Sequence, residues 1–470
     1  MLLDSISSSI EYLHVPYVGE EIEMPAVKLK FNKHEVMTEL TREALGLCGL
    51  KETKDQKQAV LVWGKQFDIT EYSSFGPWQK VNHFAGAYLI GRKDNFHKYM
   101  MSFKKKEPEL GKFYPSSYLL PDQAEDLSKI WKKHKLWIKK PSASSRGRGI
   151  KVISSENKPP KKSGLVQVYI EKPFLITGRK FDIRMYILIP SVNPLKIYVH
   201  SNGMARFCSQ KYKMDDPTDL HSHLTNFSIN KNDSNFIRCS GEESVEDSKW
   251  TLQFFHKYLK ENGYDADKIF DSLYQTATKT FLIGMTAVRD KHIRYVYHRN
   301  VSSELYGIDI ILDENLNPHV MEVNISPSMK GSDSKLDHDL KLPVMLDTLR
   351  LFKIYQTSSD VVTEFEKAVR QSVSNERLNS VMKGQDPWEK PVISDIQTVK
   401  EFLYEQANAG GYRLMYPTKE TVEEYKSCLE NMHYNDIVLL NWVKMNDERK
   451  EKVLAANIKK YKKFLSQFQK

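Results

Sequence analysis

Segment 305–326, LYGIDIILDENLNPHVMEVNIS, constrains the fold more than any other part of the sequence. Two apolar runs flank the turn sequence DENLN, which predicts an antiparallel hairpin. If Asp313 pairs with Pro318, a register assumed here, Asp309 lies directly opposite Glu322. Facing acids destabilise a sheet, so a positive charge is expected between them.

Asn324 lies two residues beyond Glu322 and therefore on the same face of the predicted strand. Carboxylate and amide oxygens in one place suit Mg²⁺, which fills its octahedron with water and phosphate. Asp309, Glu322 and Asn324 are thus candidate metal ligands, although an acid couple that is protonated or paired with cations would give the same pattern. The sequence has no H-E-x-x-H motif, and we expect His221 and His223 to form structural hydrogen bonds.

Segment 138–150, IKKPSASSRGRGI, places Lys140 at the end of a predicted strand and before a loop of small residues. Glycines let backbone amides approach anionic oxygens, and the basic side chains Arg146 and Arg148 neutralise charge, so the segment predicts phosphate binding. A basic turn between two strands is the alternative. The spacing matches neither the Walker motif nor G-x-G-x-x-G.

The run KFDIRMYILI at 180–189 alternates strictly. Apolar side chains occupy one face of the predicted strand, while Lys180, Asp182 and Arg184 share the other. That charged face would meet a ligand or solvent, and Asp182 between two cations could also form a structural ion pair.

The run LKIYVHSNGMARFC at 195–208 predicts two strands joined by a Ser-Asn-Gly turn. Arg206 in the second strand is either at a sheet edge, or buried and able to bind a carboxylate or phosphate with its planar fork. Beyond it, the long polar insert 228–249 predicts a mobile loop over a site.

In this order, the motifs resemble those of an ATP-grasp ligase and, more closely, of the tubulin tyrosine ligase-like family in its glutamylase branch. The resemblance covers roughly residues 60 to 350 and rests on these segments: VNHFAGAYLIGRKD, FYPSSYLLP, KPSASSRGRGI, LVQVYIEKPFLI, KFDIRMYIL, GMARF, HLTNFSINK, KW and MEVNISPS.

This resemblance implies a mixed α+β or α/β chain with an ATP-grasp-like fold of tubulin tyrosine ligase type and a helical C-terminal extension. We expect four domains: an N-terminal α/β domain at 1–112, a central ATP-grasp domain at 113–178, a C-terminal ATP-grasp domain with the metal site at 179–355, and a helical basic extension at 356–470.

The resemblance also implies roles for individual residues, with ATP and Mg²⁺ as cofactors. The expected catalytic residues are Lys140, Arg146, Lys180, Arg206 and Glu322. The expected nucleotide contacts are the phosphate residues Lys140, Arg146, Gly147 and Lys180, the adenine hinge of Gln167, Val168, Tyr169 and Ile170, and Asp182, Thr225 and Asn226. The free amino acid would contact Arg206, Phe227, Ser228 and Lys249, and the metal would contact Asp309, Glu322 and Asn324.

Two positions depart from the family pattern. Phe227 stands where the family usually has Tyr, which removes a hydroxyl near the amino-acid site. Ser142 replaces a common Pro, a change that we expect to be neutral.

The chain carries a formal charge of +10, which favours an acidic partner. Residues 446–470 hold eight Lys or Arg against three Asp or Glu, a surplus of +5. Four widely spaced cysteines indicate a reduced compartment, and no apolar run is long enough for a membrane span. We therefore expect a cytosolic or nuclear monomer that binds neither membranes nor nucleic acid.

The resemblance implies an ATP-dependent ligase that adds free L-glutamate to the γ-carboxylate of glutamates in acidic tubulin tails, through an acyl phosphate. Microtubules in the cytoplasm, including those of the cilium or basal body, would be the partner, with other acidic proteins as further substrates. The alternatives are a glycine or tyrosine ligase of the same fold and a non-catalytic microtubule-binding protein. Arg206 and Lys249 distinguish among the ligases, because a side-chain carboxylate requires more positive charge than glycine does.

Overall fold

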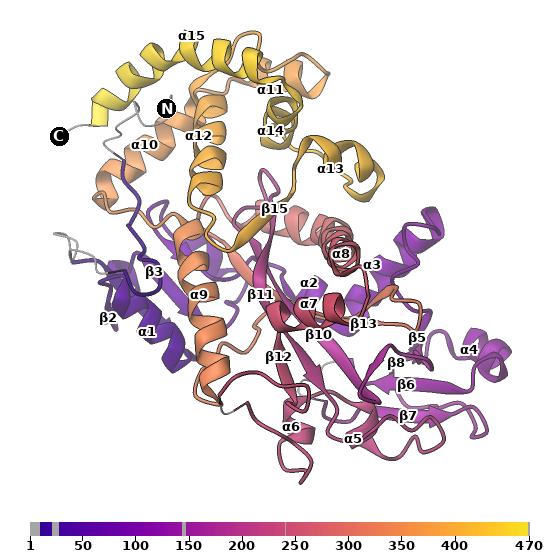
Figure 1. Cartoon of the computed structure of the whole chain (residues 1–470). Helices are drawn as coiled ribbons and strands as arrows, with labels where there is room; N and C mark the ends of the chain where they lie inside the picture. The colour runs from indigo at the N-terminus through magenta and orange to yellow at the C-terminus, as the bar shows by residue number, and fades with distance from the viewer. Residues whose placement is uncertain (1–9, 21–27, 143–146, 240, 469–470) are drawn as a thin grey trace.

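The computed structural model describes residues 10–20, 28–142, 147–239 and 241–468. Its helices and strands form three sheets with a layer of helices above them (Figure 1). This mixed architecture confirms the fold class that the sequence predicts.

The first sheet is parallel, with the strand order β2-β1-β3-β4. Its strands are β1 (Lys30–His34), β2 (Lys51–Thr53), β3 (Leu61–Gly64) and β4 (Lys80–Val81), and α1 (Glu39–Leu47) connects the first two. Parallel neighbours need such a crossover. The buried side chains of Leu40 and Leu45 on α1 join the same apolar cluster as Phe31 and Leu61. Two further helices, α2 (Tyr88–Gly91) and α3 (Lys93–Lys106), follow this sheet.

The second sheet is antiparallel, with the order β5-β8-β6-β7. It consists of β5 (Ser117–Leu120), β6 (Leu136–Lys140), β7 (Lys151–Ser154) and β8 (Gly164–Val168). The helix α4 (Ala124–Ile130) buries Leu127, and the adjoining Trp131 stacks on Trp137 with ring centroids 5.1 Å apart. These contacts fix the strand that ends at Lys140.

The third and central sheet has the order β12-β11-β10-β13-β14, with β9 paired to β10 and β15 paired to β11. Its strands are β9 (Leu175–Ile176), β10 (Arg179–Ile189), β11 (Ile197–Phe207), β12 (Lys249–Thr251), β13 (Glu304–Leu312), β14 (Pro318–Asn324) and β15 (Tyr412–Tyr416). All of β10 is buried. The apolar face of β10 packs with α7 (Leu252–Glu261) and α8 (Ala266–Tyr295), while Tyr186 and Leu188 on the other face pack with α9 (Lys335–Phe352).

The predicted turn at Ser-Asn-Gly is wrong, because β11 runs through these residues as one strand. The pairing of β10 with β11 shifts register between Met185 and Ile187, which absorbs the irregular sequence as a bulge. A Cβ on Gly203 would lie 2.5 Å from the carbonyl oxygen of Arg184, so glycine permits close approach here and not a chain reversal.

The assumed register of the 305–326 hairpin is also wrong by one residue, since Leu312 and not Asp313 pairs with Pro318. A register shift between Ile310 and Asp309 corrects the offset, and Asp309 does lie opposite Glu322 as expected.

The C-terminal part forms the helical layer at the top of Figure 1. It consists of α10 (Ser359–Gln371), α11 (Asn375–Met382), α12 (Ile393–Ala407), α13 (Lys419–Glu424), α14 (Tyr434–Lys444) and α15 (Asp447–Leu465). This segment is more than a helical extension, because β15 adds a strand to the central sheet. The division into four domains stays a prediction.

The stretch 372–391, whose sequence suggests a loose linker, is anchored to the rest of the protein. It contains α11, the buried Trp388, and an ion pair between Arg377 and Asp395 of 2.8 Å. Among the helices that the structure describes, none is long and apolar enough to cross a membrane.

Candidate active site

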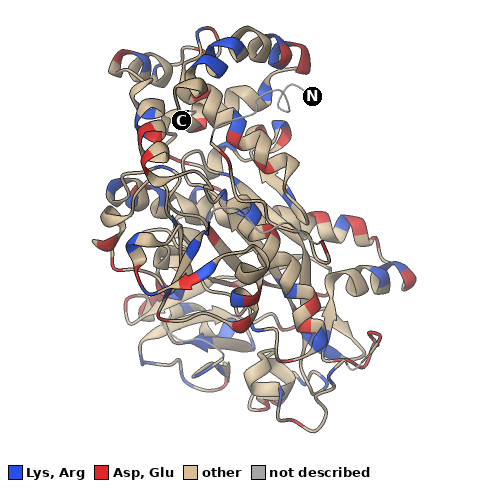
Figure 2. Cartoon of the chain, turned by 90° about the vertical axis from the view of Figure 1, so that its left-hand side faces the viewer, with Lys and Arg blue, Asp and Glu red and all other residues tan. Residues whose placement is uncertain are grey.

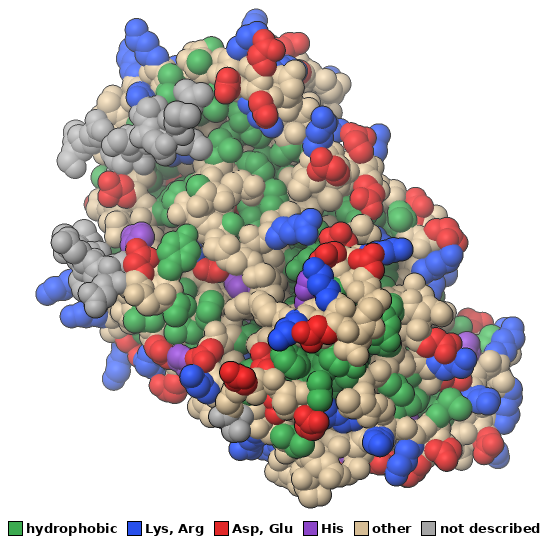
Figure 3. Space-filling view, in the orientation of Figure 1, with side chains coloured by type: hydrophobic (Ala, Val, Ile, Leu, Met, Phe, Trp, Pro, Cys, Tyr) green, Lys and Arg blue, Asp and Glu red, His purple; other side chains and the backbone are tan. Residues whose placement is uncertain are grey.

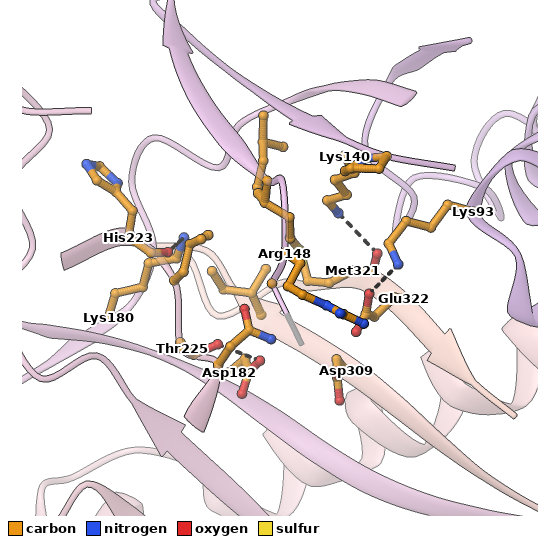
Figure 4. A pocket seen from close by; sticks show the side chains of 17 residues that line it. Lys93, Lys140, Arg148, Lys180, Asp182, His223, Thr225, Asp309, Met321 and Glu322 are labelled. Atoms are coloured by element: carbon orange, nitrogen blue, oxygen red, sulfur yellow. Dashed lines mark hydrogen bonds and ion pairs between the residues drawn. The ribbon is translucent and has the colours of Figure 1, made fainter. Parts of the chain in front are cut away.

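A pocket lies between the second sheet and the central sheet (Figure 4). Strands β6, β10, β13 and β14 and the segment around Thr225 contribute its walls. A larger cavity adjoins it, and Lys93, Asn226 and Glu322 line both. The described residues predicted to bind phosphate, metal and amino acid therefore meet around two connected spaces, whereas the predicted hinge residues 167–170 line neither of them.

Two buried lysines lie in the pocket. Lys140 Nζ donates to Gln167 Oε1 at 2.8 Å and to the Met321 carbonyl at 3.2 Å. Lys180 Nζ donates to Tyr169 Oη at 2.6 Å and to the His223 carbonyl at 2.9 Å. These acceptors are all neutral, and burial lowers the pKa of each lysine to about 8. An anionic ligand such as phosphate fits this pair.

Gly147 and Arg148 line the pocket. Gly147 has φ of +74°, and a Cβ there would lie 2.8 Å from Asn226 Oδ1, so this position requires glycine. Arg148 points across the pocket toward Glu322 (Figure 4). Arg146, predicted to contact phosphate, lies outside the described residues.

The predicted adenine hinge begins within β8, which includes Gln167 and Val168, and continues beyond the strand to Ile170. The amides of Val168 and Tyr169 donate to the carbonyls of Ser116 and Leu136, so both are already used within the sheet. Other backbone groups of this segment would have to hold an adenine. Tyr169 Oη lies 2.7 Å from Nδ1 of His223, which confirms a structural hydrogen bond for that histidine.

The charged face of β10 is buried and not solvated, and its neighbours in the sheet supply the opposite charges. Asp182 lies opposite Arg206 of β11, which donates two hydrogen bonds to it at 2.7 and 2.6 Å. Arg184 lies opposite Asp309 of β13 and donates to its Oδ2 at 2.9 Å. Arg206 also reaches Asp309 at 3.0 Å. These four side chains alternate in charge, and the Thr225 hydroxyl donates a further hydrogen bond to Asp182 at 2.7 Å.

The positive charge expected near the acid pair is present. Burial alone would raise the pKa of Asp309, but Arg184 and Arg206 hold it well below its ordinary value. Lys93, at the start of α3, forms an ion pair with Glu322 at 3.0 Å. The acid couple is therefore paired with cations in this structure, as one of the two sequence interpretations expects.

The candidate metal ligands lie together on β13 and β14. Asn324 Nδ2 lies 3.4 Å from Asp309 Oδ2 and 3.5 Å from Glu322 Oε1. Within the described residues no group of three His, Cys, Asp or Glu side chains could hold a metal, so an amide would have to be the third ligand. Oxygen donors of this kind fit Mg²⁺.

The predicted amino-acid residues line the larger cavity. Phe227 begins α6 (Phe227–Asn230), and Ser228 follows it. Lys249 begins β12 opposite Arg206, and its Nζ lies 4.4 Å from the centre of the Phe227 ring. The ring therefore contacts the ammonium group at the position where the family usually has Tyr.

The tubulin-tyrosine ligase family model matches residues 70–367. The chain belongs to this family. It is 37% identical over 332 residues to the tubulin monoglutamylase TTLL4 of Homo sapiens. The aligned region covers 69% of this chain and 27% of that protein.

Other members of the family are also similar to this chain. It is 33% identical over 404 residues to the tubulin polyglutamylase TTLL6 of Mus musculus, with 83% of this chain and 48% of that protein covered. It is 30% identical over 460 residues to the tubulin polyglutamylase ttll-4 of Caenorhabditis elegans, with 92% and 75% covered. The chain thus spans between a quarter and a half of the first two relatives. The resemblance to the glutamylase branch is confirmed.

Sequence reasoning missed the role of four residues in the contacts around the candidate site. Lys93 belongs to the motif VNHFAGAYLIGRKD but pairs with Glu322 of the 305–326 hairpin. Arg184 was recognised on the charged strand and given no role. On α9, Asp337 accepts a hydrogen bond from Lys249 and another from Lys341, and no motif signalled either α9 residue.

Proposed function

We propose that this chain is an ATP-dependent ligase that adds L-glutamate to the γ-carboxylate of glutamate residues in acidic tubulin tails. One observation carries the proposal: two buried lysines with neutral partners lie beside an acid pair and open into a cavity lined by Arg206 and Lys249. The names of the relatives, tubulin monoglutamylase and tubulin polyglutamylase, support the choice of substrate.

ATP would lie in the pocket, with its phosphates on Lys140 and Lys180 and under the loop that contains Arg146 and Gly147. Asp182, Thr225, Asn226 and the segment 167–170 would hold the rest of the nucleotide. Asp309, Glu322 and Asn324 would hold Mg²⁺, whose charge would neutralise phosphate oxygens. Phosphates would also draw Arg184 and Lys93 away from the acids that they neutralise here.

The reaction would have two steps. The acceptor carboxylate attacks the γ-phosphorus of ATP, which forms an acyl phosphate and releases ADP. The amine nitrogen of free glutamate then attacks the acyl carbon, the bond from that carbon to the phosphate oxygen breaks, and phosphate and a proton leave. Arg206 and Lys249 would fix the carboxylates of the free glutamate beside Phe227 and Ser228, so that its amine points at the acyl carbon.

The net charge supports an acidic partner, although no single basic patch dominates the described residues on the face that Figure 3 shows. Acidic and basic side chains are intermixed over the face in Figure 3, and the helices at the top of Figure 2 carry both signs. The net charge of +10 and the exposed lysines of α15 would nevertheless attract acidic microtubule tails. We propose that the chain works as a monomer on cytoplasmic microtubules, including those of the cilium or basal body.

Incubation with tubulin, ATP and isotope-labelled amino acids tests the proposal. Mass spectrometry of the tubulin tails should find added glutamate, and no addition when ATP or Mg²⁺ is omitted. Addition of glycine or tyrosine in its place would assign the other ligase activity. Microtubule binding without any addition would leave a non-catalytic binding protein.

A further inference from the structure

Lys249 is held by one residue of α9. Its Nζ donates to Asp337 Oδ2 at 2.7 Å, the one hydrogen bond that the described residues show for this ammonium group. On its other side lies the ring of Phe227, which has no hydroxyl to anchor it. The position of Lys249 in the cavity therefore depends on Asp337.

Asp337 is itself fixed in the first turn of α9. Its backbone amide donates to the Ser334 hydroxyl, which caps the helix, and that hydroxyl donates to Asp337 Oδ2 at 2.8 Å. Its other oxygen accepts a hydrogen bond from Lys341 Nζ at 2.7 Å, one helical turn later. Lys341 also donates to the Lys330 carbonyl at 2.7 Å. The carboxylate is thus buried, rigid and shared between two lysines.

The charges of this group explain why two lysines are needed. A single aspartate would neutralise Lys249 and leave it little attraction for a ligand. Lys341 supplies the charge that balances Asp337, so one positive charge remains at the cavity wall. Opposite Lys249, the group of Asp182, Arg184, Arg206 and Asp309 sums to zero. The exposed Lys231, whose Nζ lies 6.0 Å from the centre of the Phe227 ring, also carries a positive charge beside this ring. The buried surplus charge beside Phe227 comes from the lysine pair.

We infer that Asp337 and Lys341 are positioning residues of the amino-acid site. Asp337 fixes the ammonium group of Lys249. Lys341 balances the charge of Asp337, so that the positive charge of Lys249 stays available for a carboxylate of the incoming amino acid. This inference rests on the proposed function and extends it, because it gives the site a means of favouring a dicarboxylic amino acid. Free glutamate carries a net charge of −1, which the surplus charge complements.

Steady-state kinetics with a tubulin-tail peptide tests the inference. The KM for L-glutamate should rise about tenfold in Asp337→Asn, which keeps the size of the side chain but removes the charged acceptor of Lys249. It should rise about as much in Lys341→Met, because the charge of Asp337 is then no longer balanced by Lys341 and neutralises Lys249. The KM for ATP should stay within about twofold of the wild-type value. The rise in melting temperature that ATP causes should also be similar in each variant and in the wild type. Lys341→Arg keeps the charge and should retain most of the affinity for glutamate.

The double variant Asp337→Asn/Lys341→Met tests whether Lys341 acts through Asp337 or whether the two residues act independently. Lys341 acts through Asp337, so Lys341→Met should add little to the effect of Asp337→Asn, and the two effects should be far from additive. Additive effects, an unchanged KM for glutamate, or equal rises for glutamate and ATP would each overturn the inference. Failure of both single variants to fold, with Lys341→Arg folded, would assign the pair to the fold alone. A wild-type chain that adds no glutamate would instead overturn the proposed function.

Discussion

Asp309 of β13 lies directly opposite Glu322 of β14 because a bulge at Met321 shifts the register beside them. The pairs from Leu312 to Ile310 follow one register, and the pairs from Asp309 onward follow another. The carbonyl of the bulged Met321 accepts a hydrogen bond from Lys140 at 3.2 Å. One irregularity thus aligns the acid pair and also gives the buried Lys140 a hydrogen-bond acceptor.

Glu322→Gln should abolish ligation and leave the fold intact. The change removes one of the two carboxylate charges that would hold Mg²⁺. A bound metal contributes several kcal/mol to transition-state stabilisation, so turnover should fall at least about 100-fold. The variant should melt close to the wild type, because Glu322 is partly exposed and its ion pair is with one lysine, Lys93. Unchanged turnover at saturating Mg²⁺ would contradict the metal assignment.

Arg206→Ala should damage the use of the amino acid far more than the binding of ATP. Asp309 retains its bonds to Arg184, and Asp182 retains that to Thr225, so the nucleotide side keeps its framework. Loss of the Arg206 guanidinium group should raise the KM for glutamate about tenfold or more. Comparable losses for ATP and glutamate would show that Arg206 supports the fold of the site instead.

Affinity for ATP should depend on pH through Lys140 and Lys180. Burial lowers the pKa of both to about 8, and the ammonium form binds phosphate, so affinity should be full below pH 8 and fall as the pH rises through 8. Titration of the protein with ATP between pH 7 and about 9.5 measures this. Lys180→Met, which removes one of the two groups, should bind ATP more weakly and with a shallower pH dependence.

The stability of the ATP-free protein should respond in the opposite direction. Between about pH 8 and the ordinary lysine pKa of 10.5, the unfolded chain retains protons that the two folded lysines have lost. These two groups therefore raise stability as the pH increases through this window. The difference in unfolding midpoint between wild type and Lys180→Met across that range isolates one of them.

The basic helix α15 should contribute to microtubule binding through charge. Tyr461 and Leu465 are buried against the core, so removal of residues 446–470 would uncover apolar surface. Three substitutions by Gln on the exposed face, at Lys459, Lys462 and Lys463, avoid that damage. Co-sedimentation with microtubules should weaken at low salt, while a short tail peptide is still modified at a similar rate.

The control for α15 removes the same charge elsewhere. Gln at the exposed lysines Lys257, Lys260 and Lys268 of α7 and α8 lowers the net charge equally. If both triple variants lose binding to the same extent, total charge and not the α15 surface decides the attraction. Unchanged binding by the α15 variant would leave this helix with a structural role alone.

Glu405→Ala should strongly destabilise the link between α12 and the central sheet. Glu405 is fully buried and accepts hydrogen bonds from Lys196 at 2.6 Å and from Tyr198 at 3.2 Å, and it also pairs with Lys353. Its loss leaves buried lysines uncompensated and should cost about 3 to 5 kcal/mol in unfolding free energy. Glu448→Ala, which breaks an exposed pair with Lys452, is the matched control and should leave the denaturation midpoint unchanged.

The sequence by itself determined the alternating strand 180–189 and the facing acids of the 305–326 hairpin. Strict alternation in KFDIRMYILI separated an apolar face from Lys180, Asp182 and Arg184, and the structure has that division. The acid pair of the 305–326 hairpin was expected opposite each other and is. Such results depend on local periodicity and on residue type, which the sequence states directly.

Only the tertiary structure decided which groups meet across the chain. The strand passes through Ser-Asn-Gly because the backbone of β10 packs against Gly203, and no local signal records that neighbour. Lys93 reaches Glu322, and Asp337 reaches Lys249, from elements far away in the sequence. Charged side chains pair with whichever opposite charge the fold brings near in a buried place, and burial and proximity are properties of the folded chain alone.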